Sequence, residues 1–468
     1  MENKPSSKMD MSQVQAINKV KYQLPSNLNI VERRTNKVNF ADQNQYSSQS
    51  GNELVIRLQA SSDYVYGKNC YLVFDVDALG VDDADTATDF FGFSKNTAMS
   101  LFDRVLYEDR SGSELERNDA LSRYVAQVCP LHWSTEYTAT GVANAGQRET
   151  SFPLDPTVTP PTYHNNGSIA NYNIRSTIVP AVSNRLTVCI PLHWFMGVFN
   201  QETLIPSMLV SGSLIRLQLA RATDAIKRIA GATTEVASYS IYNPRVVLDS
   251  LSLAPVVQKN LMEQSQAGGG LDFCYETAYY QSGNPGTDTN FNLQVNKAVS
   301  RCQRLYWSAN AQGTPSSAAK DNVGTGQLNV SSLDYRLGDL YFPQRVLNVS
   351  GDNAQKNGGE LYENTLQSIN RMRTSVDPPS ISKNEFCNGG VALNGTPADN
   401  DNSGHAVHCQ SFEMSSALEY SGLAINNSRT LEARINFIGT PAAPQVINAW
   451  ITYLKLAKCN QLRAVIKE

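Results

Sequence analysis

Apolar and polar residues alternate with a period of two in many short segments of this chain, and residues 185–220 show the pattern most clearly. The apolar residues that would share a buried face in its two runs are Leu186, Val188, Ile190, Ile215, Leu217 and Leu219. Such spacing is typical of strands with one buried side. Between the runs lie an aromatic cluster, Trp194, Phe195 and Phe199, and a turn at residues 204–206. The segment therefore predicts two strands joined by a packed apolar connection.

Segments of the same kind predict further strands before residue 256. They lie at residues 53–59, at 70–76, around Val105 and Tyr107, and at 243–255. Ser111-Gly112 indicates a turn, and residues 115–128 have the apolar spacing of a helix. Residues 134–175 are rich in Pro, Gly, Asn and Thr, and they predict a long exposed loop.

Three consecutive glycines, at residues 268–270, interrupt regular structure because glycine fixes neither a helix nor a strand. The pattern then restarts, with strands expected at 273–277, 299–307, 333–342, within 411–438 and at 445–456. A helix is expected at 358–374, and long loops at 308–328 and 377–404. The last strand would bury the face that carries Val446, Trp450, Leu454 and Leu456.

The two halves therefore repeat one order of strands, helix and long loops, which indicates a duplicated domain. The sequence predicts β-domains at residues 51–255 and 271–468, with a linker at 256–270. Residues 1–50 differ from both domains, because they are polar and locally basic. Up to residue 37 they hold seven Lys or Arg and three Asp or Glu, a net charge of +4. We expect an N-terminal arm there, which becomes ordered against a partner.

Composition restricts the class of protein. Hydrophobic content is 41%, and the net charge of −4 argues against a surface devoted to nucleic acid or membrane. The eight cysteines are scattered without a Cys-x-x-Cys pair, which favours free thiols in the core. The chain shows no signal-peptide h-region and no apolar run of 18 residues. We therefore expect a soluble protein made in a reducing compartment.

Candidate chemistry is sparse. The five histidines are His132, His164, His193, His405 and His408. His132 and His193 lie in Leu-His-Trp sequences, which favours a core or interface role. His405, His408 and Cys409, with Cys387 upstream, could hold zinc, but their spacing matches no common zinc module.

Two acidic segments could in principle bind calcium. One spans residues 77–89, and the other spans residues 399–410, in which Gln410 stands where a calcium loop has its closing Glu. We interpret both as solvated loops. Motifs of serine hydrolases, zinc proteases and phosphate loops are absent from the sequence. The sequence thus predicts no catalytic, cofactor-binding or metal site and no small-molecule substrate, although paired glycosidase carboxylates need no local motif.

Two segments resemble one known family. The first carries Ile190-Pro191-Leu192, Trp194-Phe195, Leu204-Ile205-Pro206, Leu209 and the strand at 215–219. The second carries Ser421, Gly422, Asn427, Ser428 and Arg429. In this order and separation they resemble the double jelly-roll major capsid proteins of eukaryotic DNA viruses. The departures are Ile205, where the family usually has Leu, and Tyr420, where it often has Pro. These departures and the modest length make the chain more similar to virophage and polinton-like members than to those of large nucleocytoplasmic viruses.

The resemblance implies an all-β fold of two consecutive eight-stranded antiparallel jelly rolls with short helices in the connections. It implies a non-enzymatic major capsid protein without cofactors, located in the virion and made in the host cytoplasm or nucleus. Three copies would form a pseudo-hexagonal capsomer of an icosahedral shell that encloses DNA. Partners would be neighbouring capsomers and penton and minor capsid proteins, and the arm, on the inner side, could contact a membrane or the genome.

A second hypothesis comes from the residues alone. A β-sandwich of this size could also bind or cleave glycans. That reading predicts a cleft with paired carboxylates or an aromatic platform, and activity as a monomer.

Overall fold

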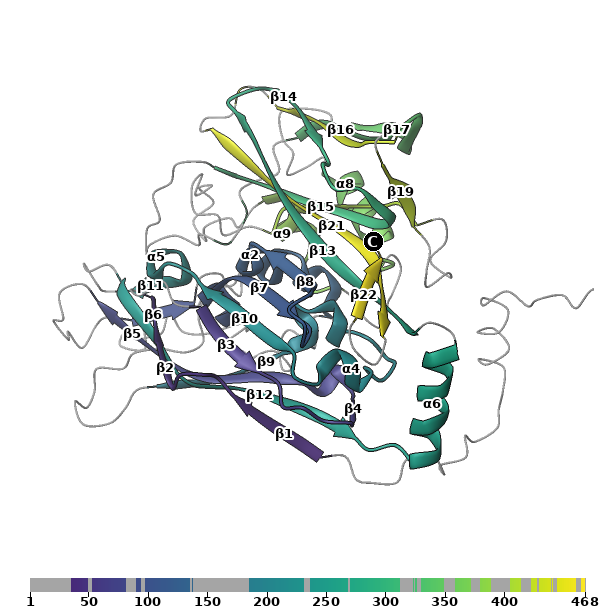
Figure 1. The fold of residues 1–468 in the computed structure, drawn as a ribbon. Coiled ribbons are helices and arrows are strands. Elements are labelled where there is room, and N and C mark those ends of the chain that lie inside the picture. The colour runs from purple at the N-terminus through teal and green to yellow at the C-terminus, as the bar shows by residue number, and fades with distance from the viewer. Residues whose placement is uncertain are drawn as a thin grey trace, which may run out of the picture.

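The computed structural model describes most of the chain outside its long loops. The described residues are 35–48, 53–80, 90–93, 97–134, 137, 185–230, 236–267, 270–311, 323, 325, 330–348, 358–371, 379–388, 405–413, 422–426, 429–438, 440, 444–459 and 464–467. The expected loops at 134–175, 308–328 and 377–404 lie largely outside them, and so do the acidic residues 81–89 and 399–404. Figure 1 shows two β-rich bodies, one formed by each half of the chain.

Two sheets form the core of the first half. Their strands are β1 (Thr35–Phe40), β3 (Glu53–Arg57), β5 (Tyr71–Gly80), β7 (Phe102–Glu108), β8 (Glu114–Asp119), β9 (Leu186–Pro191), β10 (Leu214–Leu219) and β12 (Val236–Leu251). One sheet has the order β1-β12-β5-β9, and the other has the order β3-β10-β7-β8. The short strands β2 (Gln45–Ser47) and β4 (Tyr64–Val65) pair with β12, and β6 (Phe90–Phe93) pairs with β11 (Ile226–Ala230).

The second half repeats this plan. Its strands are β13 (Leu271–Gly286), β14 (Asn290–Gln294), β15 (Val299–Ala311), β16 (Val330–Leu337), β17 (Leu340–Asn348), β18 (Val407–Ser411), β20 (Leu431–Phe437) and β21 (Gln445–Cys459). The sheet orders are β13-β21-β15-β18 and β14-β20-β16-β17, with β19 (Leu423–Ile425) and β22 (Ala464–Lys467) paired to the first of these.

The strand order identifies the architecture. When the eight main strands of each half are numbered along the chain, one sheet reads 1-8-3-6 and the other reads 2-7-4-5, in both halves. Neighbouring strands are antiparallel. Two facing four-stranded sheets of this order make a jelly roll. The predicted all-β fold of two consecutive jelly rolls is confirmed, and we refer to the halves as the first and second roll.

Short helices lie in the connections. They are α2 (Leu121–Gln127), α3 (Cys129–His132), α4 (Ser207–Val210), α5 (Ala222–Ala225), α6 (Pro255–Ala267), α8 (Gly359–Ser368) and α9 (Lys383–Asn388). Most of the segment predicted as a linker is helix α6, which joins β12 to β13 at the side of the two rolls (Figure 1). The domain limits themselves stay a prediction. Among the described residues, no helix has the length and apolar character needed to cross a membrane.

Three local predictions need correction. Residues 35–48, which we assigned to the arm, carry β1 and β2, and β1 pairs with β12 over six residues. Residues 115–119 are strand and not helix, because the turn at Gly112 folds β8 back onto β7 and the helix begins only after Ala120, at φ 53°. Residues 333–342 contain a hairpin and not one strand, because Gly338, at φ 60°, reverses the chain between β16 and β17.

The aromatic connection after β9 is buried as predicted. Trp194, Phe195 and Phe199 all belong to the core of the first roll, where Phe199 packs edge-to-face on Tyr107. The connection runs through the 3₁₀ turns η8 (Leu192–Trp194) and η9 (Gly197–Phe199). Six of the eight cysteines are buried, and all eight are free thiols.

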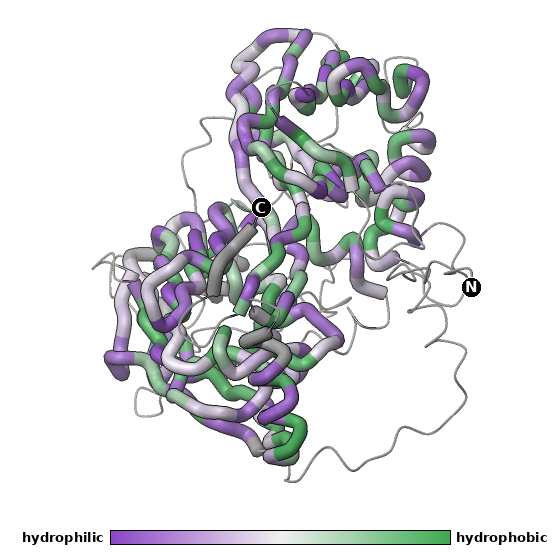
Figure 2. The backbone as a smooth tube through the Cα atoms, turned by 45° about the vertical axis from the view of Figure 1, so that its right-hand side comes forward, coloured by the Kyte–Doolittle hydropathy of each residue, from purple (hydrophilic) through white to green (hydrophobic). Residues whose placement is uncertain are grey.

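Each of the two cores includes side chains from the other roll. Phe273, Tyr275, Ala457 and Cys459 of the second roll pack in the core of the first roll, while Val128 and Leu131 of the first pack in the core of the second. Strand β21 is therefore buried on both faces, and the predicted single buried face is wrong. Ile447, Ala449 and Ile451 lie opposite Trp450 and are fully buried as well. Figure 2 shows hydrophilic and hydrophobic residues alternating along the strands of both bodies.

Candidate functional site

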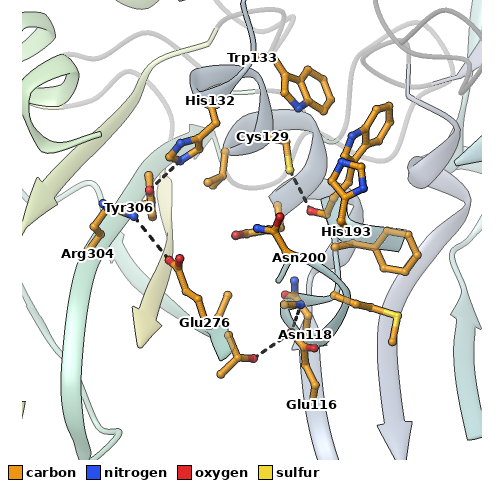
Figure 3. A pocket seen from close by; sticks show the side chains of 18 of the residues that line it. Glu116, Asn118, Cys129, His132, Trp133, His193, Asn200, Glu276, Arg304 and Tyr306 are labelled. Atoms are coloured by element: carbon orange, nitrogen blue, oxygen red, sulfur yellow. Dashed lines mark hydrogen bonds and ion pairs between the residues drawn. The ribbon is translucent and has the colours of Figure 1, made fainter. Parts of the chain in front are cut away.

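A cavity among the described residues lies where the two rolls meet. It has a volume of about 330 Å³, and side chains of both rolls line it (Figure 3). The first roll contributes β8, α2, α3 and the connection η8–η9, and the second contributes β13 and β15. We call these elements together the junction.

Backbone packs directly on backbone at the junction. Strand β13 is the edge of its sheet, and η9 of the first roll covers part of that edge. A Cβ atom at Gly197 would overlap the carbonyl oxygen of Glu276. Glycine at this position is required by the close approach of the two chains. Covering the edge strand also removes a surface that could pair with another sheet.

Glu116 on β8 connects three segments. Its carboxylate accepts hydrogen bonds from the backbone N–H groups of Gly197 (2.7 Å) and Val198 (3.1 Å), and from the hydroxyl of Thr277 on β13 (3.2 Å). The side chain is buried, and burial raises the pKa of its carboxyl to about 7, against the opposing effect of these hydrogen bonds. Glu116 thus fixes η9 against β13.

A second contact of β8 is made through its backbone. The carbonyl oxygen of Leu115 accepts hydrogen bonds from the hydroxyl of Tyr275 (2.6 Å) and from Nζ of Lys455 (3.4 Å). Both donors belong to the second roll and are buried. Since a buried backbone carbonyl is costly to leave without a partner, these bonds make β8 and β13 depend on each other.

His132 and Arg304 both line the cavity, on the same side of it and with Tyr306 between them (Figure 3). Nε2 of His132 lies 2.9 Å from the hydroxyl of Tyr306 on β15, and Arg371 donates a hydrogen bond to the His132 carbonyl (2.6 Å). Burial, reinforced by the charges of Arg304 and Arg371, lowers the pKa of His132 to about 3. His132 is therefore a neutral histidine at the interface of the rolls, as its sequence context predicted.

Arg304 is held by the second roll. Its guanidinium pairs with Glu413 (2.9 Å), lies 3.7 Å from Glu276, and donates to the carbonyl of Ser368 at the end of α8 (3.1 Å). Because two carboxylates and a carbonyl surround the cation, its charge is compensated within the junction.

Aromatic rings close the remaining side of the cavity. The rings of Trp133 and Trp194 lie 4.7 Å apart, and Nε1 of Trp194 donates to the hydroxyl of Tyr137 (3.3 Å). Two polar atoms of the lining, Asn118 Oδ1 and His193 Nδ1, are buried without a hydrogen-bond partner among the described residues. A polar cavity of this volume accommodates ordered water.

Helix α2 extends the junction over the outer face of the second roll's sheet. Tyr124 packs on Trp450 of β21 with a centroid distance of 6.2 Å. Arg123 donates to Oδ1 of Asn448 (3.0 Å), and Gln127 accepts from Ser308 (2.7 Å). This contact explains why β21 is buried on both faces.

The histidines and cysteines that sequence analysis singled out do not form one site. His408 lies in the core of the second roll, where Nδ1 meets the Tyr335 hydroxyl at 2.7 Å and burial lowers its pKa to about 3. Within the described ranges, no group of three or more His, Cys, Asp or Glu is placed to hold a metal ion. His405, Cys387 and Cys409 are buried as well, and His164 lies outside the described residues.

Sequence reasoning missed the residues that build the junction. Glu116 stands in the polar strand sequence ELERND, which we interpreted as part of a helix, and Arg304 stands in a strand of mixed polarity. Gly197 carried a usable signal, because a lone glycine inside an apolar aromatic connection indicates close backbone approach.

Of the second motif segment, the structure describes Gly422 and Arg429. Gly422 has φ 148°, and a Cβ atom there would crowd the backbone of Arg301 and Cys302 on β15. Arg429 closes a tight turn through its backbone hydrogen bonds with Asn426. Ser421, Asn427 and Ser428 lie outside the described residues.

Comparisons with known proteins agree with this architecture. No protein-family model and no curated protein sequence matches the chain. Among solved structures, the Faustovirus major capsid protein is similar over 96% of this chain and 94% of its own length, with a TM-score of 0.58 and 9% identity. A chain of the Sputnik virophage is similar over 96% and 91%, with a TM-score of 0.57 and 10% identity. The mavirus major capsid protein is similar over 100% and 96%, with a TM-score of 0.50 and 10% identity. At such identities the likeness concerns the fold, and this chain has the double jelly-roll fold.

Proposed function

We propose that this chain is a non-enzymatic major capsid protein that assembles into the icosahedral shell of a DNA virus. The observation that carries the proposal is the likeness in fold to the Faustovirus and mavirus major capsid proteins, over nearly the whole length of each chain. A fold alone does not determine function. The likeness here includes both rolls and the connection between them, so the shared structure is that of a whole capsid protein chain.

The junction supports a structural role. Several of its polar groups hold the rolls together: Glu116 accepts a hydrogen bond from Thr277, the Leu115 carbonyl accepts one from Tyr275, and His132 meets Tyr306. Contacts of this kind join the two rolls into one unit, which is the property that a shell subunit needs. The alternative, a glycan-cleaving protein, would use two free carboxylates across a cleft. Glu116 and Glu276 both line the cavity, but Glu116 already accepts three hydrogen bonds, which favours the structural role.

In this proposal three copies form a pseudo-hexagonal capsomer, because each copy supplies two similar rolls. Capsomers contact one another and the penton and minor capsid proteins of the virion. The basic N-terminal segment lies on the inner side, where its charge suits a membrane surface or the genome. Synthesis would take place in the cytoplasm or nucleus of the host.

Light scattering during size-exclusion chromatography tests the proposal on the recombinant chain, together with electron microscopy of the product. We expect a mass near three times 51.4 kDa and, under assembly conditions, hexagonal arrays or closed shells. A stable monomer that binds or cleaves oligosaccharides would contradict the proposal and favour the alternative.

A truncation tests the arm. Since β1 begins at Thr35, the deletion should end at residue 34 and spare the sheet. We expect this variant to keep the trimer and its melting temperature but to lose shell assembly. Assembly at the level of the intact chain would show that the arm plays no part in it.

A further inference from the structure

Exposed apolar side chains concentrate on two strands. The large hydrophobic residues that are exposed among the described residues are Val38 (38%), Phe40 (62%), Val256 (69%), Leu340 (49%), Tyr341 (47%) and Val346 (45%). Val38 and Phe40 belong to β1, and the last three belong to β17. Clusters of exposed apolar residues mark protein contacts more often than scattered ones do.

Strands β1 and β17 have counterparts at the same places in the other roll, and these counterparts, β13 and β8, meet at the junction. Strand β1 is the first strand of its roll and the edge of the 1-8-3-6 sheet, and β13 has this place in the second roll. Strand β17 is the fifth strand of its roll and the edge of the 2-7-4-5 sheet, and β8 has this place in the first roll.

Within the chain, the counterparts of the exposed strands pack on each other. Strand β8 contacts β13, where Leu115 meets Tyr275 and Glu116 meets Thr277. The equivalent strands cannot meet inside one molecule, because β1 and β17 lie at opposite ends of it (Figure 1). Each molecule therefore offers exposed apolar side chains on β1 and on β17.

We propose that β17 of one copy packs against β1 of a second copy of this chain, in the way that β8 packs against β13 within the chain. This inference rests on the proposed function, which it deepens by naming the two surfaces that join the copies. The occupant is a second copy because the junction already demonstrates that a fifth strand of one roll covers a first strand of the other.

The face of β1 that exposes Val38 and Phe40 continues across the sheet to Val247 and Val73, which are buried. Val38 pairs with Val247 across β1 and β12, and Phe40 pairs with Arg245. Val73 on β5 is the neighbour of Arg245, so Val38, Val73 and Val247 share this outer face. None of these three belongs to the apolar core of the first roll. On β17, Tyr341 lies 6.0 Å from the guanidinium of Arg336 and leaves half of its surface exposed.

A contact between two different surfaces is heterologous and must close into a ring to give a finite assembly. Closure with three copies would place six similar contacts around the ring, three within chains and three between them. This matches the trimer of the proposed function.

The test uses the full chain with single substitutions on the exposed residues. We expect Phe40→Asp and Tyr341→Asp each to lower the association constant of the trimer at least tenfold in light-scattering measurements, with unchanged melting of the separated monomer. Phe40→Ser and Tyr341→Ser repeat the test without adding charge. The matched control is Val256→Asp on α6, a residue that is more exposed than Phe40 or Tyr341 and lies on neither strand, and this variant should stay trimeric.

Mixing the variants distinguishes the two surfaces. An equimolar mixture of the Phe40→Asp and Tyr341→Asp chains retains one intact β1 and one intact β17 on different copies, so we expect a heterodimer near twice 51.4 kDa. If the wild type is trimeric and all four variants associate as tightly as it does, this inference is wrong while the proposed function stands. If the wild type remains monomeric and forms no shells, the proposed function fails first.

Discussion

Strands β8 and β17 occupy the same place in the two rolls, yet their surroundings are opposite to what their sequences suggest. Strand β8 reads ELERND and buries Leu115, Glu116 and Asn118. Strand β17 reads LYFPQRVLN and exposes Leu340, Tyr341 and Val346. The polar strand is covered by the second roll, while the apolar strand leaves these three side chains exposed, although its Phe342 packs on Phe412.

This difference shows that the polarity of a strand does not by itself determine whether the strand is buried in a duplicated fold. Strand β8 tolerates burial because Glu116 has partners in both rolls, namely the N–H groups of Gly197 and Val198 in its own roll and the Thr277 hydroxyl in the second roll. Strand β17 has the apolar surface that a covered position requires, but the next roll that could cover it belongs to another molecule.

The largest expected effect comes from adding a side chain at Gly197, where the two rolls are in direct backbone contact. Gly197→Val would drive a side chain into the backbone of β13, and we expect the free energy of unfolding to fall by about 3 kcal/mol, the upper range for an overpacked site. Urea unfolding followed by circular dichroism measures it. Gly359→Ala on α8 is the control, because a Cβ atom there meets only the far end of Lys383 at 3.4 Å, and stability should stay or rise by up to about 1 kcal/mol. An unchanged Gly197→Val protein would contradict the close approach at the junction.

The next effect concerns how the free energy of unfolding depends on pH. Burial raises the pKa of Glu116 from 4.5 to about 7, so the folded protein holds this proton more tightly than the unfolded chain. The contribution of Glu116 to stability is therefore complete below about pH 4.5 and is lost as pH rises to about 7, by up to about 3 kcal/mol. The lowered pKa values of His132, His193 and His408 act in the opposite direction.

Comparison with Glu116→Gln isolates the contribution of Glu116 to the pH dependence of stability, because the histidines are common to both proteins. We expect the stability of the wild type relative to the Gln variant to decline between pH 5 and pH 7.5 in matched urea titrations. A constant difference over this range would mean that Glu116 titrates normally.

Loss of the Glu116 acceptor should have a smaller effect. Glu116→Ala leaves two buried N–H groups and the Thr277 hydroxyl without this acceptor, and we expect a loss of about 2 kcal/mol at pH 7. Amide hydrogen exchange gives a local readout, because Gly197 and Val198 should lose protection while β16 and β20 do not. Retained protection at both amides would refute the role given to Glu116.

The smallest effect on stability is expected for a substitution on strand β17. Tyr341→Ser should change the stability of the isolated monomer by less than about 0.5 kcal/mol, since half of the side chain is already in water. Thermal melting at concentrations below trimer association measures it. A loss as large as that of Glu116→Ala would mean that the Tyr341 side chain is packed within its own chain.

Sequence patterns determined much of the fold because strand period and turn chemistry are local properties. The two runs at residues 185–220 became β9 and β10, and Trp194, Phe195 and Phe199 are buried as predicted. The duplication was visible in the spacing of elements, and the strand orders confirm it. The prediction went wrong where neighbours along the chain compete, as at β8, because hairpin pairing with β7 overrides a helical apolar spacing.

Only the tertiary structure decided which polar residues are buried and which apolar residues are exposed. The junction joins Glu116, Gly197 and Thr277, which lie far apart in the sequence, so no local pattern marks them as one site. The sequence by itself determined two similar rolls with apolar interiors, because alternation encodes a buried face. Which roll covers which edge strand, and which strands keep exposed apolar side chains, depends on how the rolls meet in space.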